Sequence, residues 1–295
     1  MKVFNPSGYK HVTVVQIPAE EIAKIDFADC PGSRMTPDAY YKQLNNKPAV
    51  IINGGFFDMT NGKPCFTFVD DGMTMAEDSA FPCGIGITTS GALAYTSNIG
   101  YRSDWRDFIS AYPPLVVNGE PASVSFATEI AYKARRSMIG YNMDSIFIVA
   151  ADAPGLTFEE AKKLLINIGC QYAINLDGGG STRLLLNGEL LTDRIANRPV
   201  SNVVAVYLKD DIEEDAEDAV YRVQVGAFAR KESAVALKDQ ITSLPDLIKA
   251  GYRDAKVVLN RGLYKVQVGA FSVKENARKV AEDLEKYGFA SFITQ

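Results

Sequence analysis

The sequence predicts a mixed α/β fold with βαβ units for residues 1–209 and a small ferredoxin-like α+β fold for residues 219–295. Three observations predict this division. A strand, a helix and a second strand follow one another between positions 145 and 177, and the C-terminal part contains a repeat with an offset of 43 residues. The segment 210–218 (DDIEEDAED) has seven acids in nine positions. Because so acidic a segment stays solvated, we expect it to be a linker.

Composition argues against several classes of protein. A net charge of −5 argues against a nucleic-acid partner for the whole chain, although residues 219–295 alone are basic, with 13 Lys and Arg against 8 Asp and Glu. The N-terminal segment lacks the apolar stretch of a secretory signal peptide, and no apolar run is long enough to span a membrane. The four cysteines form no C-x-x-C pair and His11 is the single histidine, which disfavours a zinc site or a histidine-based triad.

The first candidate site element is a strand that ends in a polar residue and two glycines. Residues 49–58 read AVIINGGFFD, an apolar strand followed by Asn53, Gly54 and Gly55. Glycine after a strand lets the backbone approach a ligand and turn its N–H groups toward an anion. A tight turn explains one such pair of glycines equally well.

The clearest βαβ unit surrounds a predicted helix. SIFIVAA (145–151) is a continuous apolar run, typical of a strand covered on both faces. TFEE (157–160) is a capping box that starts the helix, and YAINL (172–176) is a second buried strand. The crossover makes the two strands parallel, so Asp152 and Asp177, which follow their ends, are expected on the ligand-binding edge of the sheet. Whether they are neighbours depends on whether another strand lies between them.

A second glycine loop follows Asp177. Its glycines and hydroxyl residues are Gly178, Gly179, Gly180, Ser181 and Thr182. Two loops of the same design favour a ligand site over two unrelated turns, although neither a P-loop motif nor a G-x-S-x-G elbow is present. Arg135 and Arg136 precede the strand 145–151 and could hold a phosphate, as could Arg183 or Arg198. A solvated surface pair explains the first two equally well.

Five motifs within residues 10–208 resemble the phosphodiester glycosidase family in their order and spacing. They are INGGFFD (52–58), PPLVVNGE (113–120), RRSMIGYN (135–142), the stretch 155–188 that contains NLDGGGST, and RPVSNVVAVY (198–207). The resemblance implies hydrolysis of a sugar-1-phosphodiester, of the N-acetylglucosamine-1-phosphodiester type, at the glycosidic bond. Such hydrolysis releases the sugar and leaves a phosphomonoester.

The resemblance also implies a set of site residues. The reaction develops positive charge on the sugar and negative charge on the phosphate. We therefore expect Asp177 to be the nucleophile or general base, Asp152 a second acid/base or an orienting carboxylate, and Arg136 the phosphate clamp. The expected substrate-binding residues are Asn53, Gly54, Gly55, Gly178, Gly179, Gly180, Ser181, Thr182, Arg198 and Asn202. The chemistry requires no cofactor and no metal ligand is assigned, with Ca²⁺ or Mg²⁺ on the carboxylate and amide oxygens as an alternative.

The C-terminal repeat resembles the SPOR domain. YRVQVGAFARKESA, from Tyr221, matches YKVQVGAFSVKENA, from Tyr264, and each copy predicts a half-buried strand followed by a helix. Packing alone explains the repeated valines and phenylalanines. The resemblance implies binding of bacterial peptidoglycan along the sheet. The candidate glycan contacts are Gln224, Phe228, Gln267 and Phe271.

Together the two resemblances predict a wall-directed hydrolase, with peptidoglycan or a wall glycopolymer as its partner and a sugar phosphate as its substrate. We expect it to be made in the cytoplasm and to act on the bacterial cell wall, and a phage-encoded enzyme fits the missing signal peptide. Two alternatives stay open: a peptidoglycan hydrolase, and a non-catalytic protein that binds cell-wall glycan.

Overall fold

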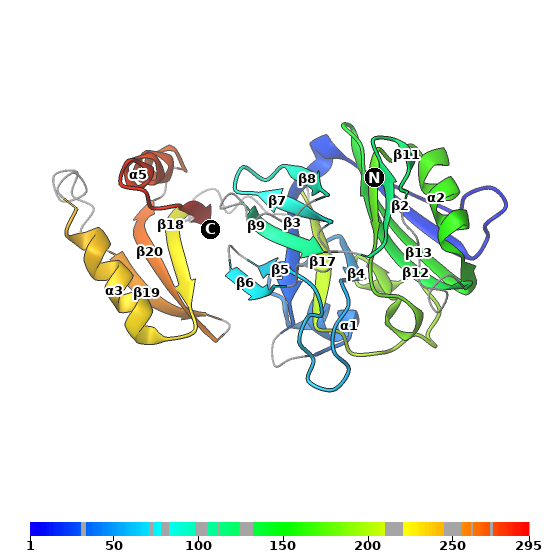
Figure 1. The fold of residues 1–295 in the computed structure, drawn as a ribbon, viewed down its shortest axis with the longest axis horizontal. Coiled ribbons are helices and arrows are strands. Elements are labelled where there is room, and N and C mark those ends of the chain that lie inside the picture. The colour runs from blue at the N-terminus through cyan, green and yellow to red at the C-terminus, as the bar shows by residue number, and fades with distance from the viewer. Residues whose placement is uncertain are drawn as a thin grey trace. The chain divides into compact units, whose positions relative to one another are not determined.

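The structure of the chain is a computed structural model that describes most of its 295 residues. The described residues are 1–30, 34–70, 73–77, 83–97, 105–110, 112–123, 132–209, 221–244, 255–260, 262–271 and 274–294. The chain divides into two compact units, Met1–Ile212 and Glu213–Gln295, whose elements are labelled in Figure 1. The expected linker 210–218 lies outside the described residues. None of the helices within them is long and apolar enough to cross a membrane.

A seven-stranded sheet forms one layer of the first unit. Its strands, in spatial order, are β1 (Lys2–Phe4), β2 (Val12–Pro18), β13 (Ser145–Leu156), β12 (Ala134–Tyr141), β14 (Tyr172–Asn175), β10 (Pro114–Val117) and β11 (Glu120–Pro121). Each of these pairings is antiparallel. Because β12 runs antiparallel to both β13 and β14, these two strands share a direction and lie one strand apart.

The two strands predicted to be parallel therefore do run in the same direction, but β12 lies between them and the described pairings of the sheet are antiparallel. On β13, Ile146 and Ile148 pack into a core shared with the other sheets. Phe147 and Val149, which alternate with them, pack into a second core on the opposite face. A strand covered on both faces carries the same continuous apolar run in either kind of sheet, so the run alone could not distinguish them.

Two five-stranded antiparallel sheets complete the β-structure of the first unit. One has the order β16 (Glu189–Leu190), β15 (Leu184–Leu186), β4 (Val50–Asn53), β17 (Asn202–Leu208) and β3 (Ile22–Asp29). The other has the order β6 (Met73–Ala76), β5 (Phe68–Asp70), β9 (Trp105–Ser110), β7 (Gly84–Thr88) and β8 (Leu93–Thr96). One core joins all three sheets and includes Ile148 from β13, Ile52 from β4 and Ile85 from β7. This shared core fixes the ends of β4 and β12 relative to one another.

Two helices cover outer faces of these sheets. Helix α1 (Pro37–Gln43) places Tyr40 in the core on the far side of the β4 sheet. Helix α2 (Phe158–Asn167) begins after Thr157 with the predicted capping box, which is confirmed, and lies along the seven-stranded sheet (Figure 1). Two short 3-10 turns, η1 (Ala19–Glu21) and η2 (Gly179–Ser181), also belong to this unit.

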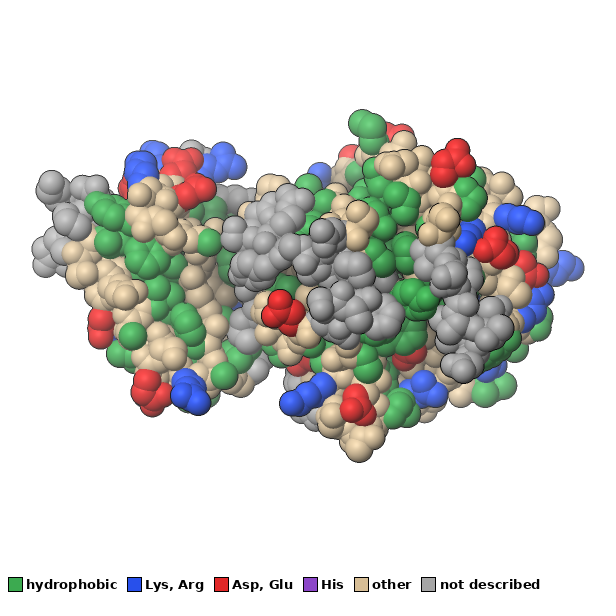
Figure 2. All heavy atoms as spheres, viewed as in Figure 1, with side chains coloured by type: hydrophobic (Ala, Val, Ile, Leu, Met, Phe, Trp, Pro, Cys, Tyr) green, Lys and Arg blue, Asp and Glu red, His purple; other side chains and the backbone are tan. Residues whose placement is uncertain are grey.

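The second unit has one four-stranded antiparallel sheet and two described helices. In chain order its elements are β18 (Tyr221–Phe228), α3 (Lys231–Thr242), β19 (Ala255–Asn260), β20 (Leu263–Phe271), α5 (Lys274–Lys286) and β21 (Phe292–Thr294). The order of the sheet is β19-β20-β18-β21. Val266 and Val280 lie in the core between sheet and helices. Charged side chains gather over α5 in Figure 2, so this helix is amphipathic, with its apolar side in the core.

Candidate active site

Asn53 ties three segments together at the end of β4. Its side chain is fully buried. The Oδ1 atom accepts hydrogen bonds from Ser137 Oγ (2.7 Å) on β12 and from Arg183 N (3.1 Å). The Nδ2 atom donates to the carbonyl oxygen of Asp177 (2.7 Å). Asn53 therefore holds the backbone that carries Asp177.

The first glycine pair packs against Asn202 on β17. Gly54 N donates to the Asn202 carbonyl oxygen (2.9 Å), and Gly55 N donates to Asn202 Oδ1 (2.7 Å). A Cβ on Gly54 would lie 1.9 Å from Asn202 Oδ1. The Gly54 carbonyl oxygen accepts from Asp177 N (3.0 Å). These N–H groups are thus used within the protein, and the glycines allow the Asp177 loop to approach β4.

Each glycine after Asp177 meets a different constraint. A Cβ on Gly178 would lie 2.5 Å from the Arg135 carbonyl oxygen. Gly179 has a φ of +62°, in the left-handed region that favours glycine. A Cβ on Gly180 would lie 3.1 Å from a guanidinium nitrogen of Arg198. Close approach to the Arg135 backbone therefore requires glycine at position 178, and the positive φ favours it at position 179. At position 180 a Cβ would require only a small shift of the Arg198 side chain.

The carboxyl group of Asp177 lies among hydrogen-bond donors in a half-buried position. Its Oδ1 accepts from Gly178 N (2.9 Å). Burial raises the pKa of Asp177 above its ordinary value, while hydrogen bonds from Ser181 and Gly178 and the charge of Arg198 act in the opposite direction. A carboxyl group with a pKa perturbed in this way is typical of functional sites.

Arg198 brings a positive charge to the same loop. Its backbone N donates to the Gly180 carbonyl oxygen (3.0 Å), and its Nη1 donates to Ser181 Oγ (3.4 Å). The side chain is half-buried. Since a guanidinium has several N–H donors in one plane, Arg198 can remain anchored to Ser181 while it binds an oxyanion.

Asp152 lies in a second carboxylate cluster. Its Oδ1 and Oδ2 both accept from Asp193 N, at 3.2 and 3.1 Å. Arg135 Nη2 donates to Asp193 Oδ2 (2.6 Å). Burial raises the pKa of Asp152, and the charge of Asp193 adds to this, against the Asp193 N–H group and the charges of Arg135 and His11. Arg135 joins the two clusters, because its carbonyl oxygen faces Gly178 and its guanidinium binds Asp193.

Arg136 lies on the other face of β12. Its guanidinium carbon is 3.9 Å from the centre of the Phe158 ring, and it donates to the carbonyl oxygens of Leu156 (3.2 Å) and Tyr132 (2.8 Å). Ser137, the next residue, faces Asn53. Since neighbours on a strand point to opposite faces, the structure places Arg136 on the α2 side rather than beside Asp177.

These motifs follow one another along the chain in the order of one known family. The model of the phosphodiester glycosidase family matches residues 46–207, more than half of the chain. The chain belongs to the phosphodiester glycosidase family. The SPOR domain model matches residues 217–295. None of the curated proteins compared with the chain matches it significantly.

Two solved structures share the fold of the first unit at low sequence identity, and a third matches the C-terminal segment in sequence. A hypothetical protein from Synechocystis is 16% identical with a TM-score of 0.56, over 70% of this chain and 61% of the other. The zebrafish N-acetylglucosamine-1-phosphodiester α-N-acetylglucosaminidase catalytic domain, auto-inhibited by its pro-peptide, is 18% identical with a TM-score of 0.53, over 70% and 87%. The peptidoglycan-binding domain of the B. subtilis cell wall lytic enzyme CwlC is 39% identical over 25% of this chain and 86% of its own, with a TM-score of 0.21. The chain thus spans less than two thirds of the Synechocystis protein.

Sequence reasoning did not single out two residues that position the site, Ser137 and Asp193, which bind predicted site residues directly. Arg183, which the sequence suggested as a phosphate ligand, donates instead to Asp38 Oδ1 through Nη2 (2.9 Å) and to the Ala196 carbonyl oxygen through Nη1 (2.7 Å). Strand alternation would have grouped residues 135 and 137 on one face, but only tertiary packing decides which face meets Asn53.

The remaining predicted site residues are buried or partly buried. Thr182 lies beside Ser181 with its side chain buried. In the SPOR domain, Gln224 is buried and pairs with Gln267 across β18 and β20. Phe228 and Phe271 pack against the core of that unit, as expected if the repeat is retained for packing. Within the described ranges no group of three His, Cys, Asp or Glu side chains could hold a metal ion.

Proposed function

We propose that the chain is a hydrolase that cleaves a sugar-1-phosphodiester, of the N-acetylglucosamine-1-phosphodiester type, at the glycosidic bond. One observation carries the proposal. The Asp177 carboxyl group, whose pKa is raised by burial, lies beside Ser181 and Arg198 on a loop that Asn53 and Gly54 hold in place. Membership of the phosphodiester glycosidase family supports it.

Asp177 and Arg198 stabilise the two charges that develop during the reaction. Positive charge develops at the anomeric carbon, where ionised Asp177 acts as nucleophile or general base. Negative charge develops on the departing phosphate, which Arg198 stabilises. We assign the phosphate to Arg198 rather than Arg136, because the Arg136 guanidinium stacks on Phe158.

Asp152 is the proposed second acid/base or orienting carboxylate. Burial raises its pKa, which favours a carboxyl group that carries a proton. Its two hydrogen bonds from Asp193 N fix the carboxyl plane. The proposed sugar-phosphate position lies against the backbone of the loop formed by Gly178, Gly179, Gly180 and Thr182. The residues that support this loop through hydrogen bonds at the ends of β4 and β17 are Asn53, Gly54, Gly55 and Asn202.

The SPOR domain is the proposed targeting module for bacterial peptidoglycan. The sheet order β19-β20-β18-β21, with a helix after each repeated strand, supports its classification as ferredoxin-like. Gln267, which is partly exposed, is the preferred glycan contact, and buried Gln224 supports it from the adjacent strand. Phe228 and Phe271 shape the sheet that carries them. We propose that the protein is encoded by a phage and acts on the cell wall.

The test is product analysis with the full chain. Incubation with an α-N-acetylglucosamine-1-phosphodiester should release free sugar and a phosphomonoester, and Asp177→Asn should abolish release because Asn can neither attack nor accept the proton. Asp144→Asn, a change in the exposed β12–β13 turn, is the matched control and should retain activity. Full activity of Asp177→Asn would remove Asp177 from the mechanism.

The same incubation with purified cell wall and teichoic acid separates the alternatives. Soluble muropeptides without free sugar would identify a peptidoglycan hydrolase. Binding to the wall with no product from any of the three substrates would identify a glycan-binding protein without catalytic activity.

A further inference from the structure

A pocket of about 630 Å³ lies at the opposite end of β12 from Ser137. Its wall includes Tyr141 at the end of β12 and Tyr172 at the start of β14, together with residues of β3 and of the turns β7–β8 and β12–β13. Tyr141 follows Ser137 by four positions along the strand, a distance of roughly 13 Å at the usual rise per residue. The pocket is therefore separate from the proposed catalytic site, and its volume lies in the range of small-ligand sites.

Stacked tyrosines make one side of this pocket rigid. The Tyr141 and Tyr172 rings stack with centroids 5.3 Å apart, and Tyr95 stacks on Tyr172 at 5.4 Å. Tyr95 N donates to the Tyr141 hydroxyl (2.8 Å), and the Tyr172 hydroxyl donates to Asn118 Oδ1. Because hydrogen bonds fix both of the rings that line the pocket, the aromatic surface is formed before any ligand arrives.

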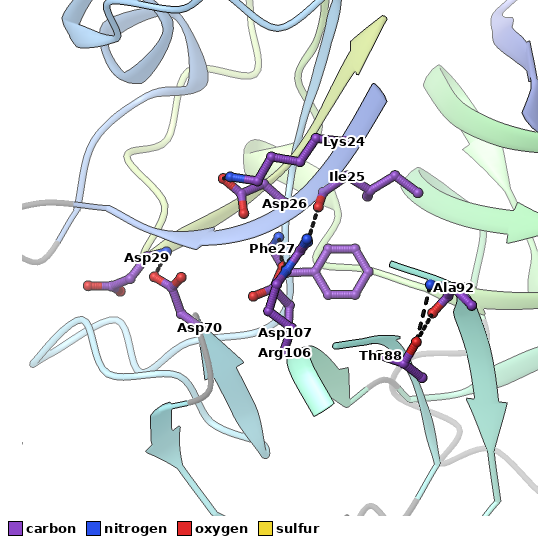
Figure 3. Close-up of polar contacts among 10 residues, drawn as sticks. All are labelled: Lys24, Ile25, Asp26, Phe27, Asp29, Asp70, Thr88, Ala92, Arg106 and Asp107. Carbon is purple, nitrogen blue, oxygen red and sulfur yellow. Dashed lines mark hydrogen bonds and ion pairs between the residues drawn. The ribbon is translucent and has the colours of Figure 1, made fainter. Parts of the chain in front are cut away.

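In the described part of the wall, Lys24 and Arg106 each pair with a neighbouring aspartate, as Figure 3 shows. Lys24 Nζ lies 3.0 Å from Asp26 Oδ2, and Arg106 Nη2 lies 2.7 Å from Asp107 Oδ2. Arg106 also donates to the Ile25 carbonyl oxygen. Among the described residues that line the pocket none is acidic. A described lining whose cations are already paired disfavours a phosphate group and favours a neutral polar ligand.

Amide and hydroxyl groups complete the lining. Gln171 contributes an exposed amide and Ser145 a hydroxyl, and the Met143 side chain at the turn is exposed. The Asn142 amide holds the turn itself, through hydrogen bonds to the Gly169 carbonyl oxygen and from Asp144 N and Ser145 N. Sugars present C–H faces that suit aromatic rings and hydroxyls that suit amides. We propose that this pocket binds a neutral saccharide, with a sugar ring on the Tyr141 and Tyr172 surface, as a second glycan site of the catalytic unit. The proposal does not depend on the reaction at Asp177.

Methionine methyl NMR on the full chain tests the proposal site by site. All seven methionines lie within residues 1–143, so no methionine methyl resonance comes from the SPOR domain or reports glycan bound there. The probe is the neutral tetrasaccharide of β-1,4-linked N-acetylglucosamine, in the Asp177→Asn variant to prevent turnover. The Met143 methyl resonance should shift saturably, whereas that of Met59, which is also exposed, should not. An unmoved Met143 resonance would overturn the proposal.

Variants and a second probe sharpen the result. Tyr172→Leu should abolish the Met143 shift, Tyr172→Phe should retain it, and Gln171→Ala should weaken binding about tenfold through a lost hydrogen bond. Gln171 is exposed, so this variant tests the site even if Tyr172→Leu does not fold. Inorganic phosphate should leave Met143 unmoved. A shift with phosphate, or tetrasaccharide binding unchanged in folded Tyr172→Leu, would contradict a neutral saccharide site.

Discussion

Asp177 and Asp152 are carboxyl groups whose pKa burial raises, but their surroundings differ. Asp177 has Arg198 and a hydroxyl donor beside it, whereas Asp152 has the acid Asp193 and the more distant charge of Arg135. A nearby cation favours ionisation and a nearby anion favours the protonated form. The pair is therefore suited to divide the roles of base or nucleophile and of acid.

The raised pKa of Asp177 predicts how Asp177→Asn changes stability with pH. Below the ordinary carboxyl pKa of 3.8, Asp177 is protonated in both the folded and the unfolded chain, and burying it costs little. As the pH rises through the raised folded-state pKa, the native protein loses stability, because the folded state disfavours the charged form. Asp177→Asn has no such loss. Its melting temperature should equal that of the native protein at low pH and exceed it at pH 7. A lower value at pH 7 would contradict this prediction.

Arg198 predicts a change in the pH–rate profile. Arg198→Gln removes a charge that lowers the pKa of Asp177, so the acidic limb of the profile should move to higher pH. Loss of a charge-assisted hydrogen bond to the phosphate should also reduce kcat/KM by roughly 10- to 100-fold. Arg198→Lys retains the charge and should leave the acidic limb in place. If the acidic limb of the pH–rate profile does not move in Arg198→Gln, the charge of Arg198 does not affect the pKa of Asp177.

Single residues also show where sequence reasoning reaches its limit. The motifs located Asn53, Asp177 and Arg198, which the structure brings together. They assigned the phosphate to Arg136. Strand alternation gives β12 two faces, and the packing of α2 against one of them, which turns Arg136 toward Phe158, is not specified by the motif.

At the scale of secondary-structure elements, Arg183 connects the glycine loop 178–182 to helix α1 and to the segment before Arg198. This residue follows the glycine loop directly, and its guanidinium joins Asp38 on α1 to the Ala196 carbonyl oxygen in the segment that leads to Arg198. Burial works against ionisation of Asp38, but the hydrogen bond and charge of Arg183 lower its pKa overall. Three segments of the chain thus meet at the Arg183 side chain, two through the ion pair with Asp38 and the third through the Ala196 carbonyl oxygen.

Breaking this ion pair should destabilise the unit and loosen the site. Arg183→Met leaves a partly buried carboxylate and an unpaired carbonyl oxygen, so the free energy of unfolding should fall by about 2–3 kcal/mol. Asp38→Asn, which keeps an acceptor for Arg183, should cost less. Denaturant unfolding measures both. Equal stability of Arg183→Met and the native protein would show that the ion pair contributes nothing.

The elements also show why helices were easier to predict than sheet topology. The helix after Thr157 was predicted from its own capping box and spacing, which are local. The position of β12 between β13 and β14 depends on pairing between residues far apart in sequence, and no local pattern specifies it.

At the scale of the whole molecule, each unit has its own hydrophobic core. Of the residues that the structure describes, the core around Val266 and Val280 contains only those of the second unit, and the cores around Ile148 and Phe147 only those of the first. Independent cores allow the two units to be separated. The matches to two different family models, over 46–207 and 217–295, agree with this division into two units.

Removal of residues 217–295 should therefore affect substrates of different size differently. A small soluble sugar-1-phosphodiester reaches Asp177 by diffusion, so its kcat/KM should change less than about twofold without the SPOR domain. On intact cell wall the loss of a tethering module lowers the local substrate concentration, and release of product should fall by roughly 10- to 100-fold. Gln267→Ala in the full chain should reproduce the direction of the second effect without the first. Equal loss on both substrates would show instead that the C-terminal unit supports the catalytic fold.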